Sequence, residues 1–129
     1  MAKILLIEDD LTFLDLLRMH LASAGHEVVT AEDAALGLLA IIGETPDLIV
    51  LDLFVPYLDG FELLEALRTD PATRPIPVIV LTGHTDDETY ARARKLGAAD
   101  FFTKPVERDR LIKSIERLLT SRQTDPGAR

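Results

Sequence analysis

The sequence predicts a doubly wound α/β fold, in which helices cover both faces of a five-stranded parallel sheet. Five short apolar segments recur along the 129 residues, and each is followed by a segment with apolar residues at helical spacing. The first, third and fourth apolar segments are continuous, as in strands that are buried on both faces. This alternation of strand and helix indicates right-handed crossovers and parallel strands.

Turn-forming residues separate the expected elements. The expected strands are residues 4–7, 26–31, 47–51, 77–81 and 99–103. The expected helices are residues 11–24, 34–42, 60–69, 86–96 and 106–121. The second strand has mixed polarity, which indicates an edge of the sheet. Asp10 and Asp33 are expected to cap the first two helices, and Leu38, Ile41 and Ile42 are expected to form the buried face of the second helix.

Composition limits the classes of protein to which this chain can belong. Its length fits one domain, expected at residues 1–121, with a polar tail or linker stub at residues 122–129. The absence of cysteine excludes disulfides, thiolate metal sites and cysteine nucleophiles. The net charge of −8 disfavours direct binding to nucleic acid or anionic membranes. The sequence shows neither a signal peptide nor a membrane-spanning stretch, so the expected location is the cytoplasm.

Four of the expected strands end in charged or hydroxyl-bearing residues. Glu8, Asp9 and Asp10 follow the first strand. Asp52 follows the third strand, Thr82 the fourth and Lys104 the fifth. Ligands of doubly wound sheets bind beyond the carboxyl ends of the strands. If these strands are neighbours, the four groups line one cleft.

On spacing alone, two interpretations of this pattern stand. In the first, the acids share a cation, because crowded carboxylates repel one another. The candidate ligands are all oxygens, which favours Mg²⁺, and a carboxylate beside Mg²⁺ can be a nucleophile toward phosphorus. In the second, the first acids only cap a helix, Asp52 lies in a solvated turn, Thr82 ends a strand and Lys104 lies on the surface.

At these residues the chain resembles the receiver domain of two-component response regulators, over residues 3 to about 121. The resemblance rests on residues 4–10, on the Asp52-x-x-x-Pro56-x-x-Asp59-Gly60 turn, on Leu81-Thr82-Gly83 and on Lys104-Pro105. It implies a flavodoxin-like sheet in strand order 2-1-3-4-5 with five helices in three layers. It also implies a signalling switch rather than an enzyme, with self-phosphorylation from small phosphodonors and slow autodephosphorylation.

The resemblance implies a metal site around a phosphoacceptor. Asp52 is the expected phosphoacceptor and one of the Mg²⁺ ligands. Asp9 is expected to bind Mg²⁺ directly, Glu8 through water, and Phe54 through its backbone carbonyl. Asp10 occupies a variable position of the motif and is expected only to cap the first helix.

The resemblance also implies a conformational switch. Thr82 and Lys104 are expected to bind the phosphoryl oxygens, and the Lys104–Pro105 bond is expected to be cis. In the family, an aromatic side chain moves inward when the threonine shifts toward the phosphoryl group. Phe101 is at that position, and because it has no hydroxyl group its switching is expected to work by packing.

The implied partners are proteins. A histidine kinase or a histidine phosphotransfer protein is expected to supply the phosphoryl group. A downstream protein is expected to bind the surface formed by the fourth helix, fifth strand and fifth helix. The chain is expected to be a stand-alone or excised receiver, and a monomer or a phosphorylation-dependent dimer. Gly97-Ala98-Ala99-Asp100 contains one acid where receivers that dimerise to drive winged-helix DNA binding have two, which disfavours that dimer.

Other classes of protein fit the sequence less well. Phosphatases of the haloacid dehalogenase type need a second aspartate two residues after the nucleophile, where this chain has Phe54. Flavodoxins have a phosphate loop rich in Ser, Thr and Gly after the first strand, where this chain has three acids. Phe54 and His84 flank the expected path of attacking water. We expect Phe54 to slow hydrolysis of an aspartyl phosphate, whereas His84 could assist the water.

Overall fold

The computed structural model describes residues 2–55, 59–83 and 86–124, and it confirms the predicted fold class. Five parallel strands form one sheet in the order β2-β1-β3-β4-β5. The strands are β1 (Lys3–Ile7), β2 (Glu27–Ala31), β3 (Leu48–Asp52), β4 (Val78–Thr82) and β5 (Asp100–Thr103). The helices are α1 (Leu11–Ser23), α2 (Ala34–Glu44), α3 (Gly60–Thr69), α4 (Asp87–Lys95) and α5 (Arg108–Thr124). β2 lies at an edge of the sheet, as its mixed polarity predicts.

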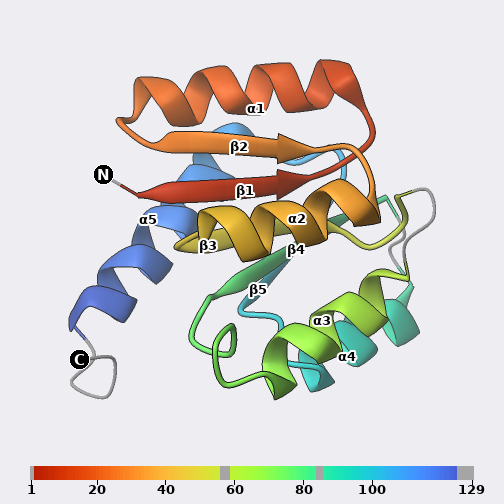
Figure 1. Cartoon of the computed structure of the whole chain (residues 1–129). Coiled ribbons are helices and arrows are strands. Elements are labelled where there is room, and N and C mark those ends of the chain that lie inside the picture. The colour runs from red at the N-terminus through yellow and green to blue at the C-terminus, as the bar shows by residue number, and fades with distance from the viewer. Residues whose placement is uncertain (1, 56–58, 84–85, 125–129) are drawn as a thin grey trace.

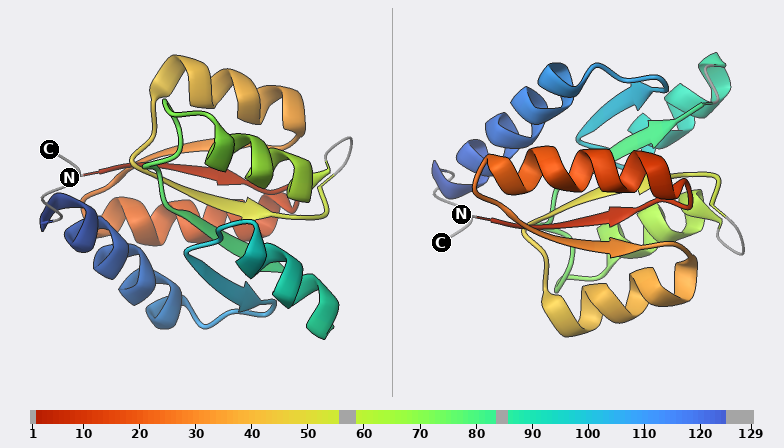
Figure 2. Two further views of the ribbon diagram at one scale, coloured as in Figure 1. Left: turned by 90° about the horizontal axis from the view of Figure 1, so that it is seen from below. Right: turned by 90° about the horizontal axis from the view of Figure 1, so that it is seen from above.

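Helices cover both faces of the sheet, so the chain forms three layers (Figures 1 and 2). α2, α3 and α4 pack on one face, and α1 and α5 pack on the other. Side chains alternate along each strand, so that Leu5 and Ile7 of β1 join the first core while Ile4 and Leu6 join the second. Fully burying each such side chain contributes about 1.5–3 kcal/mol, which explains the continuous apolar strands.

Aspartates begin four of the helices. The carboxylates of Asp10 and Asp33 accept hydrogen bonds from the backbone amides of Phe13 (3.1 Å) and Leu36 (2.9 Å), as predicted. Asp59 and Asp86 cap α3 and α4 in the same way. Each cap satisfies amides that have no partner within the helix, and it places negative charge at the positive end of the helix dipole.

The predicted buried face of α2 is wrong for two of its three residues. Ile41 is buried, but Leu38 is exposed and Ile42 is 78% exposed. The cause is the close approach of α2 to β1 at Gly37, where an added Cβ would lie 3.1 Å from Cδ1 of Ile7. Gly37 and Ile41 are one turn apart and face the sheet, whereas Leu38 and Ile42 are rotated about 100° from them.

The helix ends differ slightly from the prediction. α2 continues past Gly43 to Glu44, and Thr45 caps it in the left-handed region with φ 47°. α5 extends to Thr124, so residues 122–124 of the expected tail are helical. Within the described residues, none of the helices combines the length and apolarity that a membrane span needs.

Gly60 is expected to tolerate no side chain. A Cβ at this position would lie 2.5 Å from the Cα of Leu53, in the backbone that leads from β3 to α3. We expect Gly60→Ala to lower the free energy of unfolding by about 1–3 kcal/mol, because backbone must move to admit the methyl group. Gly43→Ala is the matched control, since nothing lies within 4 Å of its added Cβ and alanine favours the helix. Equal urea midpoints for the two variants would contradict this.

Candidate functional site

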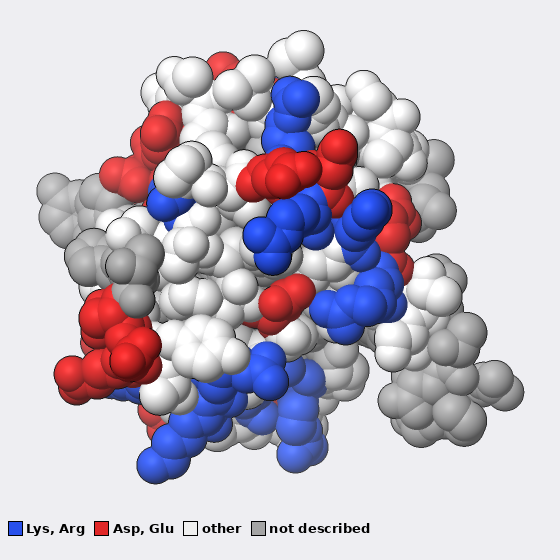
Figure 3. Space-filling view, turned by 180° about the vertical axis from the view of Figure 1, so that it is seen from behind, with Lys and Arg blue, Asp and Glu red and all other residues white. Residues whose placement is uncertain are grey.

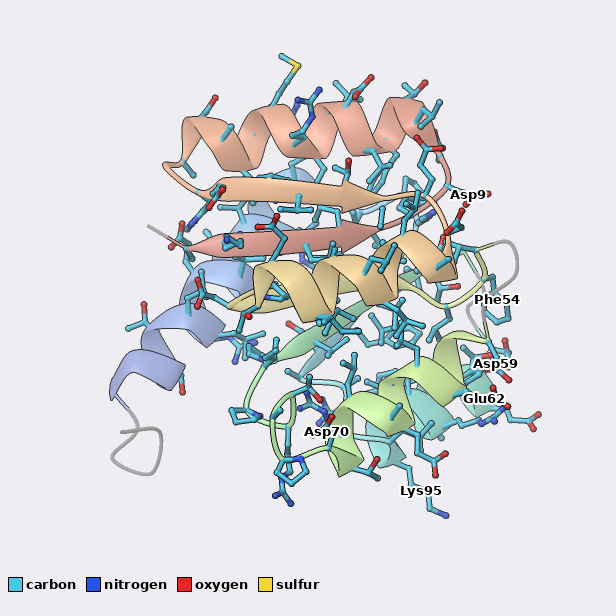
Figure 4. All side chains as sticks on the ribbon, viewed as in Figure 1. Asp9, Phe54, Asp59, Glu62, Asp70 and Lys95 are labelled. Carbon is cyan, nitrogen blue, oxygen red and sulfur yellow. The ribbon has the colours of Figure 1, made fainter. Side chains whose placement is uncertain are left out.

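The predicted site residues gather at one edge of the sheet, beyond the carboxyl ends of the strands. Figure 4 shows Asp9 and Phe54 at this edge. Glu8 and Asp9 follow β1, and Asp52 is the last residue of β3. Leu81 of β4 pairs with Asp52, so Thr82 lies one residue further toward the same edge. The register of the parallel strands therefore brings together groups that are far apart in the sequence.

Three carboxylates form the centre of the site. One oxygen from each of Glu8, Asp9 and Asp52 lies within 4.8 Å of the others. Glu8 and Asp52 are buried, and Asp9 is exposed. Three carboxylates at this spacing, one of them exposed to solvent, fit Mg²⁺, because this ion binds a few carboxylates and keeps several of its water ligands. The donor set therefore fits the predicted ion, with Glu8, Asp9 and Asp52 as the side chains that would hold it.

Lys104 bridges the two buried acids. Its ammonium donates hydrogen bonds to Oδ2 of Asp52 (2.8 Å) and to Oε1 of Glu8. Burial acts to lower the pKa of Lys104, but hydrogen bonds to Asp52 and Glu8 and their charges outweigh burial and raise that pKa. The Lys104 backbone amide donates to the Thr82 carbonyl (2.7 Å), and the Lys104–Pro105 bond is cis, as predicted.

The Glu8 carboxylate folds back onto its own backbone. Its Oε2 accepts hydrogen bonds from the amides of Asp9 (2.8 Å) and Asp10 (3.1 Å). Burial raises the pKa of Glu8, and the charge of Asp52 adds to this, while the hydrogen bonds from Lys104 and Asp10 act in the opposite direction. A cation that joined these carboxylates would relieve the same electrostatic cost.

Phe54 sits directly beside the predicted phosphoacceptor. Its backbone amide donates to Oδ1 of Asp52 (2.9 Å), so both carboxylate oxygens of Asp52 have a hydrogen-bond donor. The exposed Phe54 ring packs edge-on against Phe61 of α3, with ring centres 6.3 Å apart. The guanidinium of Arg92 on α4 lies 4.1 Å from the centre of the Phe61 ring. This stack links the β3–α3 loop to α4.

The two predicted switch residues belong to neighbouring strands. Thr82 is fully buried at the end of β4, and Phe101 of β5 is partly buried. The Phe101 ring packs edge-on against Tyr90 of α4, with ring centres 5.1 Å apart. The sequence did not predict this contact between Tyr90 and Phe101. Pro56 and His84, which the sequence singles out, lie outside the described residues.

Phe13 is a further residue at the site that the sequence did not suggest. It is on α1, and the Lys104 ammonium lies 5.3 Å from the centre of its ring. An aromatic face attracts a cation at this distance. Lys104 is thus held by carboxylates and by this ring. Helical periodicity alone assigns Phe13 no role in the core, and no local signal links it to a lysine at the other end of the chain.

Comparisons with known proteins identify the family. Residues 4–116 match the model of the response regulator receiver domain. The chain is 40% identical over 126 residues to the transcriptional regulatory protein FixJ of Bradyrhizobium diazoefficiens, covering 98% of this chain and 60% of FixJ. It is 34% identical over 119 residues to the protein PilH of Pseudomonas aeruginosa, covering 92% of this chain and 98% of PilH.

Solved structures agree with this match. The signal receiver domain of a signal transduction histidine kinase from Syntrophus aciditrophicus has a TM-score of 0.89 at 31% identity, covering 97% of this chain and 95% of that one. A receiver domain protein from Methanospirillum hungatei has a TM-score of 0.87 at 30% identity, covering 94% and 95%. The chain belongs to the response regulator receiver domains of two-component systems.

Proposed function

We propose that this receiver domain is a phosphorylation switch with Asp52 as the phosphoacceptor. The observation that supports this most is the placement of a buried aspartate between two further acids and a lysine at one sheet edge. The donor is a phosphohistidine of a kinase or phosphotransfer protein, or a small phosphodonor. A bond forms between Asp52 and phosphorus, and the bond from phosphorus to the leaving group breaks, with the electron pair leaving on the donor.

Each residue of the site has a task in this transfer. The carboxylates of Glu8, Asp9 and Asp52 and the Phe54 carbonyl would hold Mg²⁺, which would supply positive charge to the phosphoryl oxygens. Lys104 now pairs with Asp52, and after transfer it pairs with a phosphoryl oxygen instead. The Thr82 hydroxyl donates to another phosphoryl oxygen. Positioning and charge neutralisation supply most of the rate enhancement in such reactions.

The same event changes the surface of the domain. A shift of Thr82 toward the phosphoryl group leaves space beside β5, which Phe101 fills by moving inward. Because the Phe101 ring contacts Tyr90, this movement changes α4 as well as β5. A local change of charge thus shifts the balance between two packing arrangements. A downstream protein then binds the surface formed by α4, β5 and α5.

The chemistry of this output surface favours an acidic partner. A groove of about 340 Å³ lies between β5 and α5. Arg117 in its lining pairs with Asp100 at 3.2 Å, and the lining also includes Phe101, Phe102, Arg110 and Lys113, so the basic side chains outnumber the one acid. Basic side chains gather on this side of the molecule (Figure 3), although the net charge of the chain is −8. An apolar floor with a basic rim is complementary to a segment that combines apolar and acidic side chains.

Beryllofluoride, an analogue of the phosphoryl group, tests the proposed site directly. Fluorine NMR is expected to show bound beryllofluoride in the wild type when Mg²⁺ is present, and no bound signal in Asp52→Asn or in the presence of a chelator. Asp59→Asn is the control, since Asp59 caps α3 and does not belong to the acid cluster of Glu8, Asp9 and Asp52. A bound signal of equal intensity in Asp52→Asn would contradict the proposal.

Phe54 is expected to prolong the phosphorylated state. Its ring packs against Phe61, and its backbone amide binds Asp52, so we expect the ring to hinder the approach of water to an aspartyl phosphate. We expect Phe54→Asn to shorten the half-life of the aspartyl phosphate several-fold, and Phe54→Leu to change it much less, because leucine also excludes water. The half-lives are measured by the loss of phosphoprotein after the donor is removed. An unchanged or longer half-life in Phe54→Asn would show that the ring gives no protection.

A further inference from the structure

The outward side of α2 is an apolar surface to which neither the site nor the proposed switch assigns a role. Four large side chains of this helix are between 46% and 78% exposed, namely Leu36, Leu38, Leu39 and Ile42. They form one continuous arc opposite Gly37 and Ile41, which face the sheet. α2 is the outermost element on its side of the molecule (Figure 2). No charged residue occurs between Asp33 and Glu44.

The size of this apolar patch matches the apolar part of a specific interface. The four side chains expose on the order of 400 Å², within the range of the largest patches on monomers, which often mark interaction sites. A standard interface buries roughly 800 Å² per partner, of which about 57% is apolar. The patch would therefore supply almost the whole apolar share of one such interface, with polar neighbours as its rim.

We propose that the occupant of this patch is the α2 helix of a second copy of the chain, in an antiparallel two-fold pair. A two-fold axis places the same patch on both sides of the interface, and Leu36, Leu38, Leu39 and Ile42 then bury one another without meeting a charged group. Leu39 lies near the middle of the helix and so close to the axis.

The charges at the two ends of α2 also favour a second copy. The Asp33 carboxylate caps its own helix, and Glu44 pairs with Lys3 at 3.0 Å. Both flanking acids are therefore engaged within the chain, and they offer little for a basic partner to bind. In the antiparallel pair, the Lys3–Glu44 ion pair, whose charges cancel, lies beside the partner helix's end with the capping Asp33.

This association does not depend on phosphorylation. α2 packs on β1 and β2, whereas the proposed switch acts through β4, β5 and α4. The dimer would leave the α4, β5 and α5 surfaces of both copies open, so one assembly presents two output surfaces to a downstream partner. The inference does not rest on the proposed function, because it concerns the outward side of α2, which contacts β1 and β2 rather than the elements of the switch.

Sedimentation velocity tests the proposal with matched variants. The wild type is expected to shift from monomer to dimer between about 1 µM and about 300 µM, the range for a modest interface. The double variant Leu39→Gln/Ile42→Gln is expected to stay monomeric. Leu16→Gln/Met19→Gln, which changes two exposed side chains of α1, is the control and is expected to dimerise like the wild type. Beryllofluoride is expected to change none of these results.

The absence of cysteine from the chain allows a second, independent measurement. In Leu39→Cys, oxidation is expected to link two chains rapidly, since the cysteines meet near the axis. Met19→Cys on α1 is expected to link at the slow rate of random collision. The proposal is overturned by a wild type that stays monomeric over the whole range, by dimers that survive Leu39→Gln/Ile42→Gln, or by equal cross-linking of the two cysteine variants. An unrelated protein captured by the patch in place of a second copy would overturn it as well.

Discussion

Asp52→Asn is expected to slow phosphorylation by acetyl phosphate at least ~1,000-fold, because an amide cannot act as the carboxylate nucleophile. The substitution keeps the size and shape of the side chain, and its one remaining oxygen can still accept from either the amide of Phe54 or the ammonium of Lys104, which bind different oxygens of Asp52. The rate is followed by intact mass, as the fraction of protein that has gained one phosphoryl group.

The control for this substitution is another aspartate near the same loop. Asp59 caps α3 through the amides of Phe61 and Glu62 and lies outside the acid cluster. Asp59→Asn preserves a capping side chain and is expected to be phosphorylated at close to the wild-type rate. If Asp52→Asn were modified as fast as Asp59→Asn, a different residue would be the acceptor.

Lys104→Met is expected to lower the free energy of unfolding by about 2–3 kcal/mol when Mg²⁺ is absent. The variant keeps the length of the side chain but leaves Glu8 and Asp52 as buried carboxylates without a cation between them. Removing one partner of a fully buried pair costs about 3–5 kcal/mol, and the expected value is smaller because the Lys104 side chain is 26% exposed. Urea denaturation measures the difference.

Lys3→Met is the matched control for this variant. The Lys3 ammonium pairs with Glu44 at 3.0 Å, and its side chain is 27% exposed, close to the value for Lys104. Its partner is an exposed glutamate, so the loss is expected to be much smaller than in Lys104→Met, because solvent screens an exposed pair. Addition of Mg²⁺ is expected to stabilise Lys104→Met more than the wild type, because the ion binds the native state and supplies the missing positive charge. Equal losses in the two variants would contradict the account of Lys104 as the central cation.

Much of the fold could be predicted because local signals agreed with the tertiary structure. Continuous apolar runs such as Leu48–Leu51 mark strands that are covered on both faces, and the aspartates at residues 10 and 33 mark the beginnings of helices. The grouping of Glu8, Asp52 and Lys104 could also be anticipated, since parallel strands place their carboxyl ends at one edge.

Other features depend on distances that a sequence does not reveal. In α2 almost every residue is apolar, so periodicity could not choose between Ile41 and Ile42, and the close approach of Gly37 to β1 decided the orientation. The contact of Lys104 with Phe13, and that of Phe101 with Tyr90, join segments that only the packing of α1 and α4 brings together. The fold-back of the Glu8 carboxylate onto the amides of Asp9 and Asp10 likewise follows from the local turn geometry.

The most direct test of Asp52 as the phosphoacceptor is to locate the modified residue in the wild-type protein. The protein is incubated with acetyl phosphate and Mg²⁺, the acyl phosphate is trapped by borohydride reduction, and tandem mass spectrometry assigns the site. We expect modification of Asp52 alone, with almost none when a chelator removes Mg²⁺. Modification at Asp9, at Asp59 or at any residue other than Asp52, or modification of Asp52 that does not depend on Mg²⁺, would contradict the proposed function.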